Sequence, residues 1–585
     1  MLERNSKLIN KKFYQYLIPS VLTIFAMQFA SLFDGIIVGN LLGGVALSAS
    51  SMAVPVILIV QMPGLALGVG GAIVVGSLLG KRDTKKANAA FSACLIFGMA
   101  FGLLVCALGA FIAKPIASLF AIELQDGIYA YLLVYFLGDP IIIFSILMAS
   151  FMTIDNNPRL SSFFYILANV IKIASMFLFI QVFNWGMYGA ALSLIVGFGL
   201  ASLSLIKYFR SEKRMLKFTF KLKGCFSDFK LSLKASGATA LNYTLNAVQM
   251  IIVNIVISSA VTDYNDLLIY GLICNMIFVF DLFSGGILSL LPTLCGIFNG
   301  EKDYYSLKQV AKKVYILNLL SSLIITIIIL SIPNVYSTVF GFDVPAYQER
   351  ANFIIRIFVF TFIPYELNIF NMNYYPSIER NSPSYVTVLL REALIVIPVT
   401  VALVYTKGLE GYAIAQIITE VATLIITYSF VLIYSKYKNI GKGIFMIPKL
   451  DYESYDISID NNIDNVAIVS KEIADFAINN KIDNRNAQMI ALAAEEMISN
   501  IIAYGYNSHK QNFIDINFKI ISDKIVLRIR DDGVPFDPTK YDFDNNDNYS
   551  TMGIKMVLDL TDNMQYMRII NLNNTTIEIK LKETI

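Results

Sequence analysis

Three short segments near the end of the sequence carry residue types suited to phosphate chemistry. Glu496 and Asn500 lie one turn apart on an expected helix. There a carboxylate and an amide can activate a nucleophile or water and hold Mg²⁺. Asp531-Asp532-Gly533 closes an expected strand with a tight loop, where an Asp can accept a hydrogen bond from an adenine amino group. Gly553 opens another helix, whose N–H groups can receive phosphates.

A second group of candidates consists of charged residues inside long apolar runs. A charge within a membrane helix is costly and is seldom kept without a role, although each could instead form a structural ion pair or lie at a helix interface. A buried carboxylate can lose its charge by protonation at modest cost, which is what a coupling site needs. The members are Asp34, Asp139, Lys172, Asp281, Glu366, Arg391, Glu392 and Glu420.

The composition divides the chain into two parts that suit different solvents. Of 585 residues, 56% are hydrophobic and only 15% are charged, well below the fraction of an ordinary globular protein. From Asp456 onward there are 13 Lys/Arg against 20 Asp/Glu; since the whole chain is +3, residues 1–455 carry +10. An apolar basic part followed by a polar acidic part indicates a membrane domain joined to a soluble one.

The apolar part contains repeated runs of about 20 residues, each long enough to cross a bilayer of about 30 Å. We expect twelve membrane helices. Their approximate spans are 13–38, 52–79, 89–112, 128–152, 160–182, 186–208, 235–260, 266–298, 313–333, 351–375, 384–405 and 411–435.

Lysine and arginine collect in alternate connections between these spans, which predicts that both termini are cytoplasmic. The N-terminal Lys7, Lys11 and Lys12 belong to the same side. The sequence also repeats at an offset of about 220 residues, since Gly80-Lys81-Arg82-Asp83 is matched by Gly300-Glu301-Lys302-Asp303. Two six-helix halves of equal orientation follow, residues 1–225 and 226–440, with a substrate cavity between them.

The soluble part follows a polar linker at 441–455 and occupies residues 456–585. Apolar periodicity predicts helices at 464–480, 485–504 and 553–563 and strands at 513–520, 524–530, 565–571 and 575–582. The fold class is therefore an all-α polytopic membrane protein of about twelve helices in two bundles, followed by a C-terminal α/β sandwich.

The membrane part resembles the MATE (multidrug and toxic compound extrusion) transporters. The likeness lies in Phe33-Asp34-Gly35-Ile36-Ile37-Val38-Gly39-Asn40, in Gly64-Leu65-Ala66-Leu67-Gly68, in the helix around Arg391-Glu392 and in the turn Gly408-Leu409-Glu410-Gly411. It covers about residues 8–440 and implies H⁺- or Na⁺-driven antiport of bulky, drug-like small molecules. Asp34 falls at the family's helix 1 carboxylate, which is its H⁺ or Na⁺ acceptor.

Two departures from the family pattern affect coupling. Where the family often has Asn and, four residues later, Asp, this chain has Lys172 and Met176; Asn242 stands where some relatives have Glu. An ammonium at Lys172 could pair with Asp34 and replace the cation there, which puts Na⁺ coupling in question.

The tail resembles the histidine-kinase-like (GHKL) ATP-binding fold, in particular the anti-sigma-factor serine kinases, over about residues 456–582. In that family Glu496 would be the catalytic base and Asn500 the Mg²⁺ ligand, while Asp531, Gly533, Gly553 and Thr575 would contact ATP. Pro535 replaces a second Gly of the first glycine box. The absence of a Walker motif from the sequence argues against ATP-driven transport.

The resemblances imply an efflux antiporter in a bacterial inner membrane, surrounded by lipids, whose tail binds Mg-ATP. The tail would regulate the transporter or phosphorylate a cytoplasmic protein of the anti-anti-sigma kind on serine; we expect no nucleic-acid partner. The alternative is a membrane-anchored sensor or protein kinase whose transporter-like part detects a ligand without moving it, an option that Lys172 keeps open.

Overall fold

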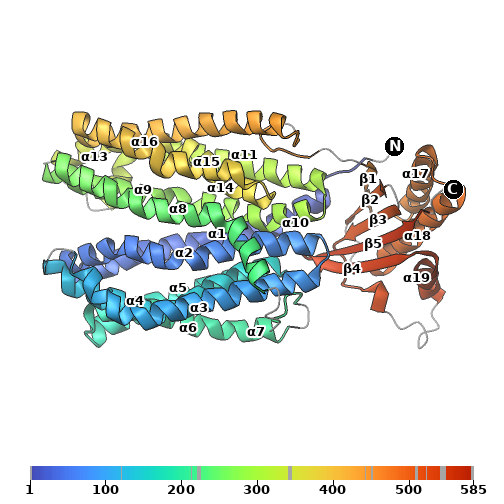
Figure 1. The fold of residues 1–585 in the computed structure, drawn as a ribbon, viewed down its shortest axis with the longest axis horizontal. Coiled ribbons are helices and arrows are strands. Elements are labelled where there is room, and N and C mark those ends of the chain that lie inside the picture. The colour runs from blue at the N-terminus through green and yellow to red at the C-terminus, as the bar shows by residue number, and fades with distance from the viewer. Residues whose placement is uncertain are drawn as a thin grey trace. The chain divides into compact units, whose positions relative to one another are not determined.

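The computed structural model describes residues 3–119, 122–211, 214–219, 225–261, 263–339, 345–441, 443–448, 452–506, 511–521, 524–540 and 549–581. It divides into two compact units. Tyr16–Ile447 forms a helical membrane unit, and Met1–Gln15 joins Pro448–Ile585 in a second unit that contains the sheet (Figure 1). The first fifteen residues therefore group with the tail, whereas the sequence placed them with the N-terminal half.

The N-terminal half of the membrane unit is built from long helices joined by short turns. Each helix begins or ends close to a predicted span. The elements are α1 (Lys7–Leu42), α2 (Gly44–Gly80), α3 (Thr84–Ala117), α4 (Ile122–Ile154), α5 (Pro158–Phe177) continued by η1 (Leu178–Val182), and α6 (Gly186–Ala201) continued by η2 (Ser202–Ser204) and α7 (Leu205–Phe209).

The C-terminal half repeats this organisation with more interruptions inside its helices. Its elements are α8 (Cys225–Ala260), α9 (Tyr264–Leu288) with η3 (Leu291–Cys295) and α10 (Gly296–Gly300), α11 (Tyr304–Ser331), α12 (Pro333–Val339), α13 (Pro345–Phe358) with η4 (Val359–Thr361) and α14 (Phe362–Ser377), and α15 (Asn381–Leu389) with η5 (Leu390–Leu394) and α16 (Val396–Tyr437).

Among the described residues, eleven helical segments are long and apolar enough to cross a membrane. The last runs from Asn381 to Tyr437, and α16 within it is interrupted by the non-helical Gly408, with φ 59° and ψ −138°. Because the parts before and after Gly408 are each long enough to cross a bilayer, this segment contains two of the twelve predicted crossings.

The two halves meet where the sequence repeats itself. A Cβ at Gly80 would lie 2.4 Å from the carbonyl oxygen of Ile297, and one at Gly300 would lie 2.2 Å from that of Ser77. Close to this contact, Glu379 accepts hydrogen bonds from Ser77 Oγ at 2.6 Å and from Lys81 Nζ at 3.0 Å. The equivalent glycines of the repeat thus allow backbone contact at one end of the pseudo-symmetric interface.

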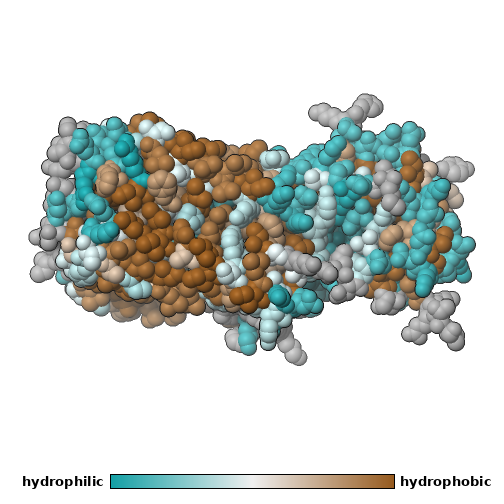
Figure 2. Space-filling view, turned by 90° about the horizontal axis from the view of Figure 1, so that it is seen from above, coloured by the Kyte–Doolittle hydropathy of each residue, from teal (hydrophilic) through white to brown (hydrophobic). Residues whose placement is uncertain are grey.

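The surface of the membrane unit matches its composition. Its visible face is a broad apolar area, whereas the visible face of the other unit is mostly polar (Figure 2). Exposed large apolar side chains occur along the membrane helices, including Phe111, Leu203 and Ile433, which are 77%, 62% and 69% exposed. Apolar exposure of this extent is expected only where lipid covers the surface.

The sheet of the second unit has five antiparallel strands in the order β1-β2-β3-β5-β4. They are β1 (Glu453–Asp460), β2 (Phe513–Ile521), β3 (Lys524–Asp531), β4 (Asn563–Ile569) and β5 (Leu572–Lys580). The helices are α17 (Asp464–Asn479), α18 (Asn484–Tyr504) and α19 (Tyr549–Leu560), with a short turn η6 (Pro538–Lys540). One apolar core joins these helices to the sheet, so this unit is the expected α/β sandwich.

Four details of this unit differ from the sequence prediction. Helix α19 begins at Tyr549 instead of at 553, so Gly553 lies inside the helix and does not open it. Strand β1 was not predicted, although Tyr455, Ile457 and Ile459 alternate with polar residues as a half-buried strand requires. Strands β4 and β5 begin two to three residues earlier than expected, because Ile570 and Asn571 have positive φ and form the turn between them.

The expected linker 441–455 is also divided between the two units. The carbonyls of Ile444 and Phe445 accept hydrogen bonds from Tyr375 and Tyr374, and Met446 is buried. These residues belong to the membrane unit, whereas the other end of the expected linker already lies in β1.

Candidate functional site

The N-terminal half holds one buried ion pair between two membrane helices. Lys172 of α5 donates from Nζ to Oδ2 of Asp34 on α1 at 2.7 Å. The lysine side chain is 6% exposed and the aspartate side chain 33% exposed. Oδ1 of Asp34 has no hydrogen-bond partner among the described residues. The pair that we expected is therefore present, and it leaves one carboxylate oxygen able to bind a proton.

Asp139 lies in the same half, on α4, but it is organised differently. Its side chain is completely buried, and neither of its oxygens has a hydrogen-bond partner among the described residues. Burying an ionised carboxylate without a partner is very costly, so this side chain is expected to be neutral. Pro140 follows it within the helix.

In the C-terminal half, three of the remaining intramembrane candidates form one network. Arg391 of η5 contacts Glu420 at 2.7 Å and Glu392 at 2.6 Å, and its guanidinium lies 4.5 Å from the ring centre of Tyr365. Two amides extend the network: Asn368 donates to Glu420 at 2.8 Å and Asn246 donates to Glu392 at 3.2 Å. Every direct partner of this arginine is therefore itself buried or hydrogen-bonded.

Two more predicted carboxylates surround this network. Glu366 is completely buried on α14, and its backbone carbonyl accepts a hydrogen bond from Asn318 at 3.0 Å. Asp281 of α9 is half-buried and interacts electrostatically with Arg391 and with Glu366. The sequence analysis identified the charged members but missed Asn246, Asn368 and Tyr365. These three residues could have been suggested by their positions on apolar helices that neighbour the charged residues.

In the sheet unit, the three predicted boxes come together at the end of α18. Gly533 packs against Gly505, the residue after that helix, since a Cβ at Gly533 would lie 2.4 Å from the Gly505 carbonyl oxygen. Val534 N also donates to that carbonyl at 2.7 Å. On α19, a Cβ at Gly553 would lie 1.9 Å from Oε2 of Glu496. Glycine is needed at 533 because the neighbouring atom belongs to the backbone, whereas at Gly553 the neighbouring atom is the end of the flexible Glu496 side chain.

Asp531 is held firmly in its loop. Its Oδ1 accepts hydrogen bonds from Gly533 N and from Asn573 Nδ2, both at 2.8 Å, and the residue is 3% exposed. Burial raises the pKa of this carboxyl to about 6, although the Asn573 and Gly533 hydrogen bonds oppose the shift. Asn573 is a positioning residue that the sequence did not single out; its place on β5, paired with Asp531, was the available signal.

The other predicted residues of this site lie on adjoining elements. Glu496 and Asn500 are half-buried on α18, and Asn500 Nδ2 donates to the Glu496 carbonyl at 2.7 Å. This bond leaves the amide oxygen of Asn500 available for a cation. Thr575 is 5% exposed on β5, opposite Ile529 of β3. The polar, Asn/Asp-rich sequence from Pro538 to Tyr549 predicts a mobile lid over a nucleotide, but most of this segment falls outside the described residues.

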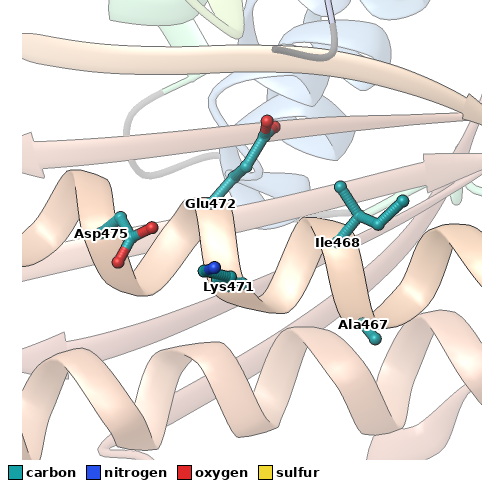
Figure 3. Close-up of a pocket in the computed structure, with 5 residues that line it drawn as sticks. All are labelled: Ala467, Ile468, Lys471, Glu472 and Asp475. Carbon is teal, nitrogen blue, oxygen red and sulfur yellow. The ribbon is translucent and has the colours of Figure 1, made fainter.

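Mg-ATP is the ligand that these residues would hold, and the donor set fits it. A single amide oxygen beside a carboxylate suits Mg²⁺, which usually takes one or two protein ligands together with phosphate oxygens. The described residues contain no group of three or more His, Cys, Asp and Glu side chains that could form a metal site of their own. A surface hollow on α17, lined by Ala467, Ile468, Lys471, Glu472 and Asp475, includes none of these residues (Figure 3).

The membrane unit is thus a bundle of long helices with charged side chains buried among them, and the sheet unit is an α/β sandwich. Residues 19–178 match the MatE family model, and residues 459–580 match the histidine kinase-like ATPase domain model. The chain therefore contains one segment that matches the MatE model and another that matches the histidine kinase-like ATPase domain model, in agreement with the two resemblances found in its sequence.

Two curated multidrug export proteins are also similar to part of this chain. The multidrug export protein MepA of Staphylococcus saprophyticus is 28% identical over 28% of this chain and 37% of that protein, and MepA of Staphylococcus haemolyticus is 25% identical over 30% of this chain and 39% of that protein. The chain thus matches less than half the length of these curated relatives.

Solved structures extend the likeness to the whole membrane unit. An outward-facing MATE transporter of the MOP superfamily has a TM-score of 0.65 and 17% identity, covering 72% of this chain and 94% of that one. A MATE transporter of Vibrio cholerae has a TM-score of 0.67 and 15% identity, covering 73% and 97%. At these identities the likeness establishes the fold of the membrane unit.

Proposed function

We propose that this protein is a secondary active efflux antiporter for drug-like or toxic small molecules, whose C-terminal domain binds Mg-ATP and regulates transport or acts as a serine kinase on a cytoplasmic partner. The observation that carries the transport proposal is the ion pair between Asp34 and Lys172. Support comes from the MATE fold of the membrane unit and from relatives that are named multidrug export proteins.

The geometry of this pair favours H⁺ over Na⁺ as the coupling ion. The ammonium of Lys172 already occupies Oδ2 of Asp34, so Na⁺ would have to compete with a fixed cation. A proton needs only the free Oδ1. Protonation removes the charge of Asp34, weakens its attraction to Lys172 and lets the two helices rearrange. A cationic substrate would do the opposite, because it binds best when Asp34 is ionised.

We propose that the C-terminal domain binds nucleotide through the loop that contains Asp531 and through helices α18 and α19. Asp531 would accept the adenine amino group, Asn500 would hold the metal ion, and the start of α19 would receive phosphates. Glu496, beside Gly553, is placed to accept a proton from an attacking hydroxyl or water. Asp531→Ala should abolish nucleotide binding, whereas Glu496→Ala should keep it and lose any phosphotransfer.

A second candidate function is a membrane-anchored sensor or kinase that detects a ligand without moving it. The specific observation in its favour is again Lys172, since a permanent partner for Asp34 would suit a static binding site.

We also propose that the two six-helix halves form separate bundles, because the sequence repeats itself. We propose that both termini lie in the cytoplasm, because of the distribution of Lys and Arg.

Efflux from proteoliposomes separates the two candidates. The protein is reconstituted with an aromatic cation such as ethidium, and a pH gradient or a Na⁺ gradient is imposed in turn. Antiport predicts dye movement with the pH gradient, abolished by a protonophore. Dye binding without movement under either gradient would instead support the sensor.

A further inference from the structure

The first residues of the chain are bound to the edge of the ATPase domain. The described part of this segment begins at Glu3, whose carbonyl accepts a hydrogen bond from Ser458 N at 3.4 Å. Asn5 N donates to Ser458 Oγ at 3.1 Å, and Ser458 Oγ lies 3.2 Å from the Asn5 carbonyl. Ser458 belongs to β1, which is an edge strand of the sheet. The segment therefore covers an edge that would otherwise be open.

A buried ion pair makes this contact specific. Arg4 approaches Asp456 of β1 at 3.1 Å and Asp515 of β2 at 3.9 Å. The side chains of Arg4 and Asp515 are 5% and 4% exposed. Charges are rarely buried unless they are paired, so this arginine belongs to the folded domain.

The same segment then contacts the loop of the nucleotide site. Lys11 Nζ lies 2.6 Å from Oδ2 of Asp532, and Lys12 Nζ lies 3.7 Å from the same oxygen. Lys11 also donates to Asn512 at 3.2 Å. Asp532 is the neighbour of Asp531, and Gly533 N donates to the Asp531 carboxylate, so Asp532 lies between two residues that are hydrogen-bonded to each other.

Both lysines lie on α1, which runs as one helix from Lys7 to Leu42 and also carries Asp34. At about 1.5 Å per residue, a helix covers roughly 33 Å from Lys12 to Asp34. Pro19 lies inside this stretch, but the helix is continuous, and coupling between distant sites can be carried along a secondary-structure element. The Asp532 contact and the Asp34 ion pair therefore lie on one continuous element.

We propose that α1 couples the two sites: nucleotide binding at Asp531 alters the contact of Asp532 with Lys11 and Lys12, and α1 carries this change to the Asp34–Lys172 pair. The proposal rests on the proposed function of both sites. Coupling of this kind is reciprocal, so protonation of Asp34 also changes the affinity for ATP.

The test uses the full-length protein in lipid nanodiscs and proteoliposomes, with binding of a fluorescent ATP analogue and H⁺-driven ethidium efflux as separate measurements. In the wild type, ATP with Mg²⁺ should change the efflux rate by about five-fold or more. The double variant Lys11→Ala/Lys12→Ala should bind the analogue but lose this response. Lys85→Ala, an exposed lysine on α3, is the matched control and should respond as the wild type does.

Exchanging the charges of Lys11 and Asp532 distinguishes the loss of their ion pair from a general structural defect. Lys11→Asp with Asp532→Lys restores an opposite-charge pair and should recover the response that Lys11→Asp alone loses. If the double alanine variant binds the analogue and still responds to ATP as the wild type does, the coupling proposal is wrong. If the wild type binds no analogue, the proposed nucleotide function fails, and the coupling with it.

Discussion

The two halves of the membrane unit share a repeat but organise their buried charges differently. In the N-terminal half, the carboxylate of Asp34 is held by one ammonium and is partly accessible, and Asp139 is buried apart from this pair. The C-terminal half has Arg391 between Glu392 and Glu420, against the face of Tyr365. A single pair can be opened by one proton, whereas a network of several contacts resists such a change. The comparison supports our proposal that coupling belongs to the N-terminal half, and we further propose that the C-terminal network is the more rigid of the two.

The largest effect is expected at Asp34. Asp34→Asn keeps the shape of the side chain but cannot ionise, so gradient-driven efflux should fall at least a hundredfold while expression and insertion remain normal; each tenfold loss corresponds to about 1.4 kcal/mol. Dye efflux from proteoliposomes measures this. Glu392→Gln, in the other half, is the matched control and should retain more transport. Full efflux by Asp34→Asn would remove the distinction between the halves.

The next effect concerns stability. Arg391→Met leaves two buried carboxylates without their cation, and breaking such a pair costs about 3–5 kcal/mol. Lys172→Met should cost less, because its partner is partly accessible and can take a proton. Thermal unfolding of both variants in the same detergent should therefore show the lower melting temperature for Arg391→Met. The opposite order would mean that the rigid site is in the N-terminal half.

A smaller effect is expected where the halves touch. Gly300→Ala places a methyl group against the Ser77 carbonyl, a backbone atom that cannot turn away. The contact around Gly80 and Gly300 should therefore loosen. A disulfide between Lys81→Cys and Glu379→Cys, in a cysteine-free background, should then form less readily, which is measured as reduced cross-linking. Gly199→Ala has its nearest neighbour at 4.0 Å and should cross-link as its parent does. Equal cross-linking by Gly300→Ala would show that the interface yields easily.

The smallest effect is a pH dependence in the ATPase domain. The pKa of Asp531 is raised to about 6, so between about pH 4 and 6 the folded domain binds more protons than the unfolded chain. The contribution of this carboxyl to stability therefore decreases as pH rises through that window.

Nucleotide binding should show the reverse trend, because the ionised carboxylate is the better acceptor for an adenine amino group. With a pKa near 6, affinity at pH 5.5 should be about four-fold weaker than at pH 7.5. Titration of the full-length protein with a fluorescent ATP analogue measures this. Glu496→Ala keeps Asp531 and should show the same profile; a profile that is flat from pH 5.5 to 7.5 would argue against Asp531 as the adenine acceptor.

Much of the architecture could be predicted because its signals are local. Apolar runs of bilayer length located the membrane crossings, and only the continuation of α16 through Gly408 obscured their number. Two of the nucleotide boxes were identifiable because each places a glycine near the end of a strand or the start of a helix, and the third because Glu496 and Asn500 lie one helical turn apart. Strand β1 was missed because its acidic residues resemble a linker, although Ile457 and Ile459 alternate correctly.

What could not be predicted depends on contacts between distant segments. Lys11 and Lys12 were interpreted as orientation signals, and nothing in the N-terminal sequence indicates that Asp532 is their partner. The choice of Asp34 rather than Asp139 as the partner of Lys172 likewise depends on how α1, α4 and α5 pack. Asn573, more than forty residues from Asp531 in sequence, reaches it only because β5 pairs with β3.

The most direct test of the central claim is the number of protons released when substrate binds. The wild-type protein, in weakly buffered detergent solution with a pH-sensitive dye, should release up to one proton per ethidium bound near the pH at which Asp34 titrates, because the cation favours the ionised carboxylate. Asp34→Asn should bind without any release. Equal release by the wild type and by Asp34→Asn would contradict the assignment of coupling to the Asp34–Lys172 pair.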